Sequence, residues 1–136
     1  MATMDVDVVS AERSLFSGEA EAVFGRTPEG EIGILPGHQP ILLALTSTPV
    51  RVRTAEGDQV IVAVHHGFLE VRENHLTVLA DIAELAVDID VERAKAALNR
   101  AIAHKQDPDY PGNADAEYER AILRLRIAEG HYTPAT

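Results

Sequence analysis

The fold class is decided by residues 60–79, VIVAVHHGFLEVRENHLTVL. Its first five residues are apolar at every position, which predicts a strand that is buried on both faces. Gly67 separates this strand from a second one, FLEV, and Glu73 with Asn74 forms a turn into a third, LTVL. Short strands that follow one another with tight turns predict an antiparallel all-β arrangement in this part of the chain.

Strand patterns continue on the N-terminal side. Residues 5–9 and 50–53 alternate between apolar and polar side chains, and residues 41–45 form a short apolar run. Turn sequences lie at residues 28–30 (PEG), 35–37 (LPG) and 56–58 (EGD). At least seven strands, with no helical period between them, predict an antiparallel sandwich or flattened barrel over residues 1–87.

Two stretches of this region are less regular. Residues 18–24 predict a weaker strand, with Ala20, Ala22 and Phe24 on one face because they alternate along the chain. Residues 32–38, IGILPGH, contain two glycines but lack the Lys-Ser/Thr pair and the following helix of a phosphate loop. We therefore expect a conformationally demanding turn between strands there.

The period changes to that of a helix after Val87. Asp90 is placed to cap a first helix, and Glu92 in the first turn favours the positive end of the helix dipole. The apolar positions of this helix recur at helical spacing: Val91, Ala94, Leu98, Ala101 and Ile102. Residues 107–112, DPDYPG, end it because their two prolines remove backbone donors.

A second helix is predicted from near Asn113 or Asp115 to Glu129, with Gly130 after its last turn. Its apolar seam consists of Tyr118, Ala121, Ile122, Leu125 and Ala128. The fold class is therefore α+β: an N-terminal antiparallel β-sandwich, residues 1–87, followed by a C-terminal antiparallel two-helix hairpin, residues 88–136, docked on or beside the sandwich.

Leu123 and Ile127 lie across the second helix from that seam, at about 100° per residue. Two paired helices can bury only one face of each other. The second apolar pair therefore needs another surface, which is either the sandwich or a different protein.

Composition excludes several classes of function. The chain has 12 basic and 22 acidic side chains and a net charge of −10, so nucleic acid is not an expected partner. It has no cysteine, which excludes disulfides and thiolate chemistry. No apolar run approaches the roughly 18 residues of a membrane span, so we expect membrane association only through a partner.

Catalytic and metal motifs are weak. His65 and His66 are the only adjacent histidines, but neighbouring strand residues point to opposite faces and cannot share one ion without a bulge. No nucleophile elbow, zinc-protease motif or catalytic carboxylate pair is present in the sequence. These observations favour a binding or assembly protein without catalytic residues and without a metal.

Four arginines are placed to meet across the helical hairpin. Arg93 and Arg100 share one helix face, Arg120 and Arg124 share another, and antiparallel pairing would bring the two pairs together. The alternative is an ordinary solvated flank, balanced by nearby glutamates at positions 92, 117 and 119.

Three stretches resemble the epsilon subunit of bacterial F-type ATP synthase: residues 8–18 (VVSAERSLFSG), 30–40 (GEIGILPGHQP) and 67–71 (GFLEV). The resemblance covers nearly the whole chain and implies a non-catalytic rotor subunit of the central stalk. The implied partners are gamma, the c-ring and, when the hairpin extends to block ATP hydrolysis, the alpha and beta subunits. The implied location is the cytoplasmic face of the cell membrane.

Residues 89–94, IDVERA, match a family motif that binds regulatory ATP in some members. The resemblance implies six ATP ligands: Glu84, Asp90, Arg93, Arg100, Arg120 and Arg124. No cofactor is required, and ATP would be regulatory. The chain departs from the family at His65-His66, where small residues are common, and at an insert from Pro108 to Gly112 in the helical hairpin turn.

Two rival hypotheses remain open from the sequence. One is a free-standing β-sandwich that binds a small ligand. The other is a metal-dependent β-fold enzyme that uses His65 or His66.

Overall fold

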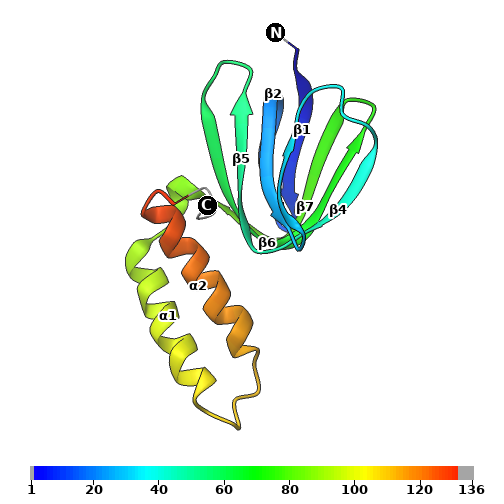
Figure 1. Cartoon of the computed structure of the whole chain (residues 1–136). Coiled ribbons are helices and arrows are strands. Elements are labelled where there is room, and N and C mark those ends of the chain that lie inside the picture. Colours follow the sequence, from blue (N-terminus) through cyan, green and yellow to red (C-terminus); the bar gives the residue numbers. More distant parts are fainter. Residues whose placement is uncertain (1, 132–136) are drawn as a thin grey trace.

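The computed structural model describes residues 2–131 and has a β-sandwich with two helices at its C-terminal end (Figure 1). The elements in chain order are β1 (Met4–Ser10), β2 (Ser14–Thr27), β3 (Gly30–Ile34), β4 (Ile41–Leu45), β5 (Thr48–Thr54), β6 (Gln59–Arg72), β7 (His75–Leu85), η1 (Ala86–Asp88), α1 (Val91–Lys105) and α2 (Ala114–Ala128). The predicted fold class, a sandwich followed by a two-helix hairpin, is confirmed.

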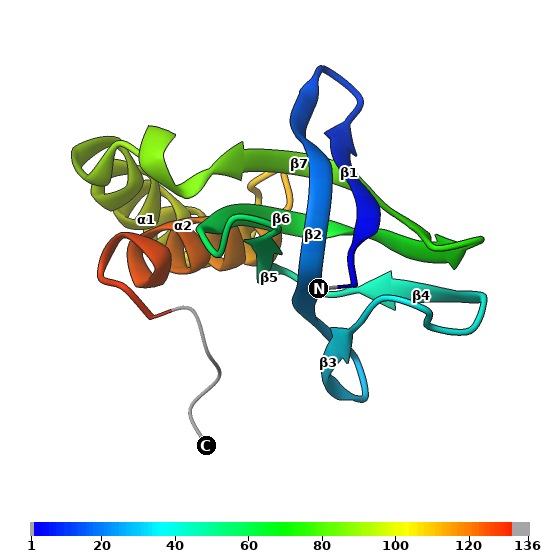
Figure 2. The ribbon, with the colours of Figure 1, turned by 90° about the horizontal axis from the view of Figure 1, so that it is seen from above.

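Five of the strands form a closed hydrogen-bonded path, β1-β7-β6-β5-β2, because β2 pairs back to β1. β3 attaches to β2, and β4 attaches to β6. The pairs are antiparallel except that β1 runs parallel to β7. Seen from above, β1 and β2 lie across β6 and β7, as expected for a flattened barrel (Figure 2).

The main core lies entirely between Met4 and Leu85, inside the sandwich. Its members come from the inward faces of all seven strands and are mostly valines and leucines. The side chains with the least exposure include Val6, Val23, Val50, Val62, Leu69 and Leu76. The helices contribute no residue to this core.

The prediction that Ala20, Ala22 and Phe24 lie on one face of the second strand is wrong beyond Glu21. Its pairing with β5 shifts register between Ala20 and Ala22, so a bulge changes which side chains point inward. Ala20 and Val23 enter the core, whereas Phe24 lies outside it, 4.7 Å beneath the Arg51 guanidinium. Strict alternation cannot anticipate a bulge, and the prediction failed for that reason.

The stretch that was expected to form two strands around Gly67 is one continuous strand, β6. Its inward face changes phase along the way, because Val64 and Leu69 both enter the core although they are five residues apart. β7 changes phase at the same level, between Ala80 and Ala83. The register between the two strands is nevertheless unchanged across this point. Both strands thus carry one extra residue each, at His66 and its neighbour Asp81.

Local turn chemistry agrees with the sequence elsewhere. Glu73 and Asn74 both have positive φ, 51° and 60°, which gives the tight β6–β7 turn. The Asn74 side chain also accepts from the Gly37 amide at 2.9 Å and donates to the Thr3 carbonyl at 3.0 Å. The strand β3 was not expected, because its glycines resemble turn residues.

Both helices begin and end close to where their caps predict. The Asp90 carboxylate accepts from the Arg93 amide at 3.1 Å, and the Asn113 side chain accepts from the Ala116 amide at 3.0 Å. Gly130, with φ 84°, follows the end of α2. No helix in residues 2–131 is long and apolar enough to cross a membrane.

The seam between the helices is narrower than expected. Ala94, Ala101 and Ala121 are buried, but Val91 and Ile102 remain about 40% exposed. Small side chains let two helices approach closely, and the contact then covers only the residues nearest the line of approach.

Candidate functional site

The hairpin is anchored to the sandwich by a small apolar cluster, which we call the junction cluster. It consists of Ile61 and Ala63 of β6, Leu123 and Ile127 of α2, and the partly buried Ala86 and Ile89. The sequence left open whether the second apolar stripe of α2 meets the sandwich or another protein. In this structure the second stripe meets the sandwich. Residues 60–64 are therefore covered by the main core on one face and by α2 on the other, as their sequence predicts.

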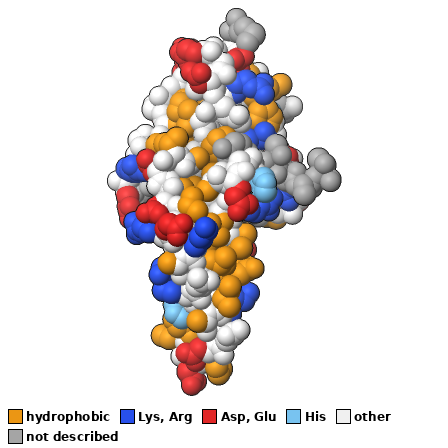
Figure 3. Space-filling model, turned by 90° about the vertical axis from the view of Figure 1, so that its left-hand side faces the viewer, with side chains coloured by type: hydrophobic (Ala, Val, Ile, Leu, Met, Phe, Trp, Pro, Cys, Tyr) orange, Lys and Arg blue, Asp and Glu red, His pale blue; other side chains and the backbone are white. Residues whose placement is uncertain are grey.

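A pocket of about 190 Å³ opens beside the junction cluster, and we call it the junction pocket. It is lined by Glu84, Asp88, Asp90, Arg93, Ala94, Ala97, Arg100 and Arg124. The structure therefore brings together five of the six residues that the resemblance implied. Arg120, one turn before Arg124, does not line it. Figure 3 shows acidic and basic side chains close together at the level where the helices meet the sandwich.

Each carboxylate of the junction pocket already has a partner. Glu84 accepts a hydrogen bond from Arg124 Nε. Asp88 lies 3.6 Å from the Arg13 guanidinium, which comes from the loop between β1 and β2. Asp90 is occupied as the cap of α1. Among the described residues, none of the three forms an ion pair with Arg93 or Arg100.

Arg93 and Arg100 of α1 face the junction pocket without an ion pair among residues 2–131. The glutamates that could have balanced them pair elsewhere: Glu92 with Lys95, Glu117 with His104 and Glu119 with His66. The arrangement offers guanidinium donors to an anion, and such donors bind phosphate oxygens in bidentate fashion.

The pKa of Glu84 is lowered by the adjacent His65 imidazole and by the hydrogen bond from Arg124, against the effect of partial burial. The carboxylate is therefore ionised at neutral pH and holds the Arg124 guanidinium at the pocket wall.

The two adjacent histidines have different surroundings. His65 is buried beside Glu84, whereas His66 is half-exposed and lies 3.5 Å from Glu119 of α2. Residues 2–131 contain no group of three or more side chains that could hold a metal ion.

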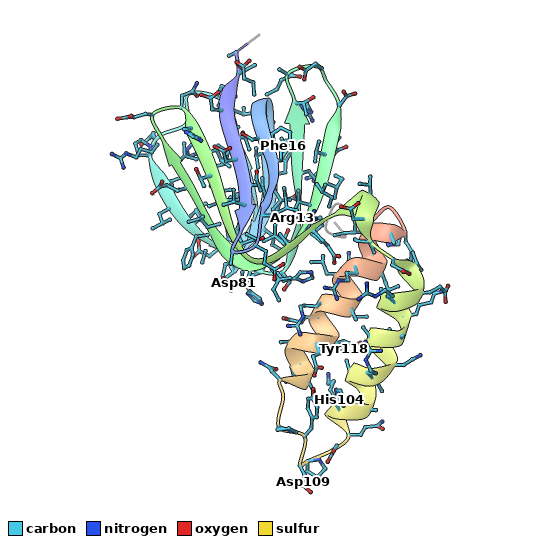
Figure 4. All side chains as sticks on the ribbon, turned by 180° about the vertical axis from the view of Figure 1, so that it is seen from behind. Arg13, Phe16, Asp81, His104, Asp109 and Tyr118 are labelled. Carbon is cyan, nitrogen blue, oxygen red and sulfur yellow. The ribbon has the colours of Figure 1, made fainter. Side chains whose placement is uncertain are left out.

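A second ion-pair network lies at the far tip of the hairpin. The His104 ring stacks on Tyr110 at 3.8 Å, and Glu117 accepts from the Tyr110 hydroxyl at 3.0 Å. That hydrogen bond raises the pKa of Tyr110. The labelled residues in Figure 4 show His104 and Tyr118 between the helices and Asp109 at the tip. The insert is thus an ordered turn, and its residues Tyr110, Pro111 and Gly112 form part of the wall of an open groove of about 510 Å³.

An apolar patch is exposed on the outer surface of the sandwich. It consists of Leu42 of β4, Phe68 of β6, and Leu79 and Ile82 of β7, which are 44–65% exposed. Phe68 and Leu79 are direct cross-strand partners, so the patch is continuous across β6 and β7. Exposed apolar side chains in a contiguous group mark a surface for association.

These features define the class as a small β-sandwich protein with a docked helical hairpin and an apolar surface for assembly.

Comparison with known proteins identifies the family. Residues 3–86 match the family of the ATP synthase delta/epsilon chain, β-sandwich domain. The chain is 50% identical to the ATP synthase epsilon chain of Streptomyces griseus, over 92% of this chain and 94% of that one. It is 43% identical to the epsilon chain of Dehalococcoides mccartyi, over 95% and 94%.

Solved structures agree. A chain of the Euglena gracilis mitochondrial ATP synthase OSCP/F1/c-ring structure is similar with a TM-score of 0.78 and 25% identity, over 96% of this chain and 83% of that one. A chain of the Tetrahymena thermophila mitochondrial ATP synthase central stalk/c-ring structure has a TM-score of 0.57 at 14% identity, over 96% of each chain, and shows the fold alone. The chain belongs to the ATP synthase epsilon chain family, as a non-catalytic stalk subunit of that complex.

Proposed function

We propose that this subunit turns with the central stalk and is held there by gamma and the c-ring through the apolar patch. The observation that carries the proposal is the exposure of Phe68 and Leu79 side by side on paired strands. Burying each of these side chains in an interface is worth roughly 1.5–3 kcal/mol. In this role the protein lies at the cytoplasmic face of the cell membrane, and it reaches the membrane only through the complex.

Co-expression with gamma tests this proposal. We expect the wild-type chain to co-purify with gamma in a fixed ratio and Phe68→Glu to lose most of it, since a charge would be buried in the contact. Val87→Glu is the matched control, because Val87 is 88% exposed on η1 and lies outside the patch. Equal recovery of gamma with Phe68→Glu and with wild type would contradict the proposal.

We propose further that the junction pocket binds regulatory ATP and that the nucleotide stabilises the docked hairpin. Support comes from Arg93 and Arg100, whose guanidiniums face the pocket without carboxylate partners among the described residues. The pocket is smaller than the roughly 300–1,000 Å³ of sites that enclose small molecules, so we expect it to hold the phosphates and leave the rest more open. Extension of the hairpin toward the alpha and beta subunits would separate α2 from the sandwich and open the site.

Isothermal titration of the full chain with millimolar ATP tests this second proposal. Arg93→Ala or Arg124→Ala should each weaken binding by about 10- to 100-fold, because a charge-assisted contact contributes about 1.5–3 kcal/mol. Arg120→Ala should have a smaller effect, and the exposed Arg126→Ala should have none. An absence of heat with the wild type, or equal affinity in all four variants, would identify the arginines as a solvated flank.

A further inference from the structure

His65 lies on the face of β6 that α2 covers, and only 3% of the residue is exposed. Neither ring nitrogen has a hydrogen-bond partner within the described part of the chain. The closest carboxylate oxygen, Glu84 Oε1, is 4.0 Å from Nε2, beyond hydrogen-bond reach. A buried imidazole of this kind carries one unsatisfied N–H when neutral and would carry two when protonated.

The charges that face His65 come from two elements. Among the described residues, Glu84 of β7 is the one carboxylate within 4.0 Å of it, and that carboxylate already accepts a hydrogen bond from Arg124 of α2. The positive charges of Arg124 and Arg120, both on α2, disfavour a positive charge on His65. Burial lowers the pKa of the His65 imidazole, Glu84 opposes this effect, and the two arginines add to it. A proton on His65 would therefore be poorly compensated while α2 is docked.

We propose that His65 makes docking of the helical hairpin on the sandwich depend on pH, so that acid releases α2. When α2 leaves the sandwich, the imidazole is hydrated, and its pKa becomes that of a free histidine, about 6.5. Undocking then takes up a proton. The docking equilibrium is constant above about pH 6.5 and weakens as the pH falls below it, by at most tenfold per pH unit for one proton. This inference concerns docking itself and does not require the junction pocket to bind a nucleotide.

His66 supplies an internal control, because it is the next residue along the chain and its surroundings differ from those of His65. It is exposed and lies 3.5 Å from Glu119 of the same helix. The two adjacent histidines therefore make different contributions to the same interface.

Energy transfer across the junction tests the inference in the full chain without nucleotide. The sequence has no cysteine, so cysteines at the exposed Glu56 and Ala103 would carry the two dyes alone. We expect the efficiency of energy transfer to be constant from pH 8 to 7 and to change progressively below pH 6.5. His65→Leu should remove that change, and His66→Gln should keep it. An unchanged profile in His65→Leu, or a wild-type signal that does not respond to pH, would overturn the inference.

Proton NMR gives a second measurement, in which the titration itself is followed in the wild-type chain and a variant at position 65 serves only to assign the resonance. The imidazole resonance of His65 in the docked wild-type chain should titrate below pH 6.5, because burial lowers the pKa of this imidazole. If His65→Leu does not fold, His65→Gln supplies the assignment. Titration of His65 at or above pH 6.5 would contradict the inference.

Discussion

At the scale of single residues, Gly67 is fixed by the close approach of β7. A Cβ at this position would lie 2.2 Å from the Leu79 carbonyl oxygen and 2.9 Å from Ala80 Cα. Both are backbone atoms and cannot rotate away. The glycine therefore does not separate two strands, as its position in the sequence suggests, but lets one strand pass close to its neighbour.

Gly67→Ala should lower the free energy of unfolding by about 2–4 kcal/mol, because the backbone of β6 or β7 must move to admit the methyl group. Urea denaturation measures the loss. Gly25→Ala is the control, since a Cβ there would meet only side-chain atoms at 3.7 Å. We expect a change below about 1 kcal/mol for the control, and equal losses in the two variants would refute this explanation.

The residues of the junction pocket show what local sequence can and cannot supply. The motif around Asp90 and Arg93 predicts that these two residues lie close together, and they do, because Asp90 caps the helix whose first turn contains Arg93. Neither Asp88, which also lines the pocket, nor its partner Arg13 was among the residues that the sequence connected with the site. That pair joins residues 75 positions apart, and they meet only in the folded chain, where the β1–β2 loop approaches η1.

At the scale of elements, α2 is held by Leu123 and Ile127. The double variant Leu123→Ala/Ile127→Ala should weaken docking by several kcal/mol, since each truncation of a buried aliphatic side chain costs about 2–4 kcal/mol. Amide hydrogen exchange in β6 and α2 would report the loss, and circular dichroism should show nearly unchanged helix content.

Ile102→Ala is the control for the docking variant, because Ile102 is 41% exposed on α1 and lies outside the junction cluster. It should leave exchange in β6 unchanged. Equal protection of β6 in the double variant and in wild type would show that other contacts hold the hairpin.

Helices and strands were not equally predictable. Both helices were placed almost to the residue, since their caps are local and act within one turn. Strand existence was mostly correct, but β3 was missed and the extent of β6 was underestimated. The inward face of β2 was wrong after its bulge, because a bulge is decided by pairing with a distant strand.

At the scale of the whole molecule, the main core is complete without the helices, because all its members lie between Met4 and Leu85. A fragment of residues 1–87 should therefore fold, with some loss of stability from exposing Ile61 and Ala63. Circular dichroism and thermal melting measure this. By the proposed function, the fragment should also bind gamma and lack any effect on hydrolysis. An unfolded fragment at room temperature would show that sandwich and hairpin form one cooperative unit.

The matched extra residues in β6 and β7 also bear on how the length of this chain can vary in evolution. Deletion of His66 would leave Val64 and Leu69 four positions apart, so both would still point inward. Deletion of Glu70, by contrast, would move Val71 to the outer surface. Insertions and deletions among relatives should therefore concentrate at His66 and Asp81, the place where the strands bend.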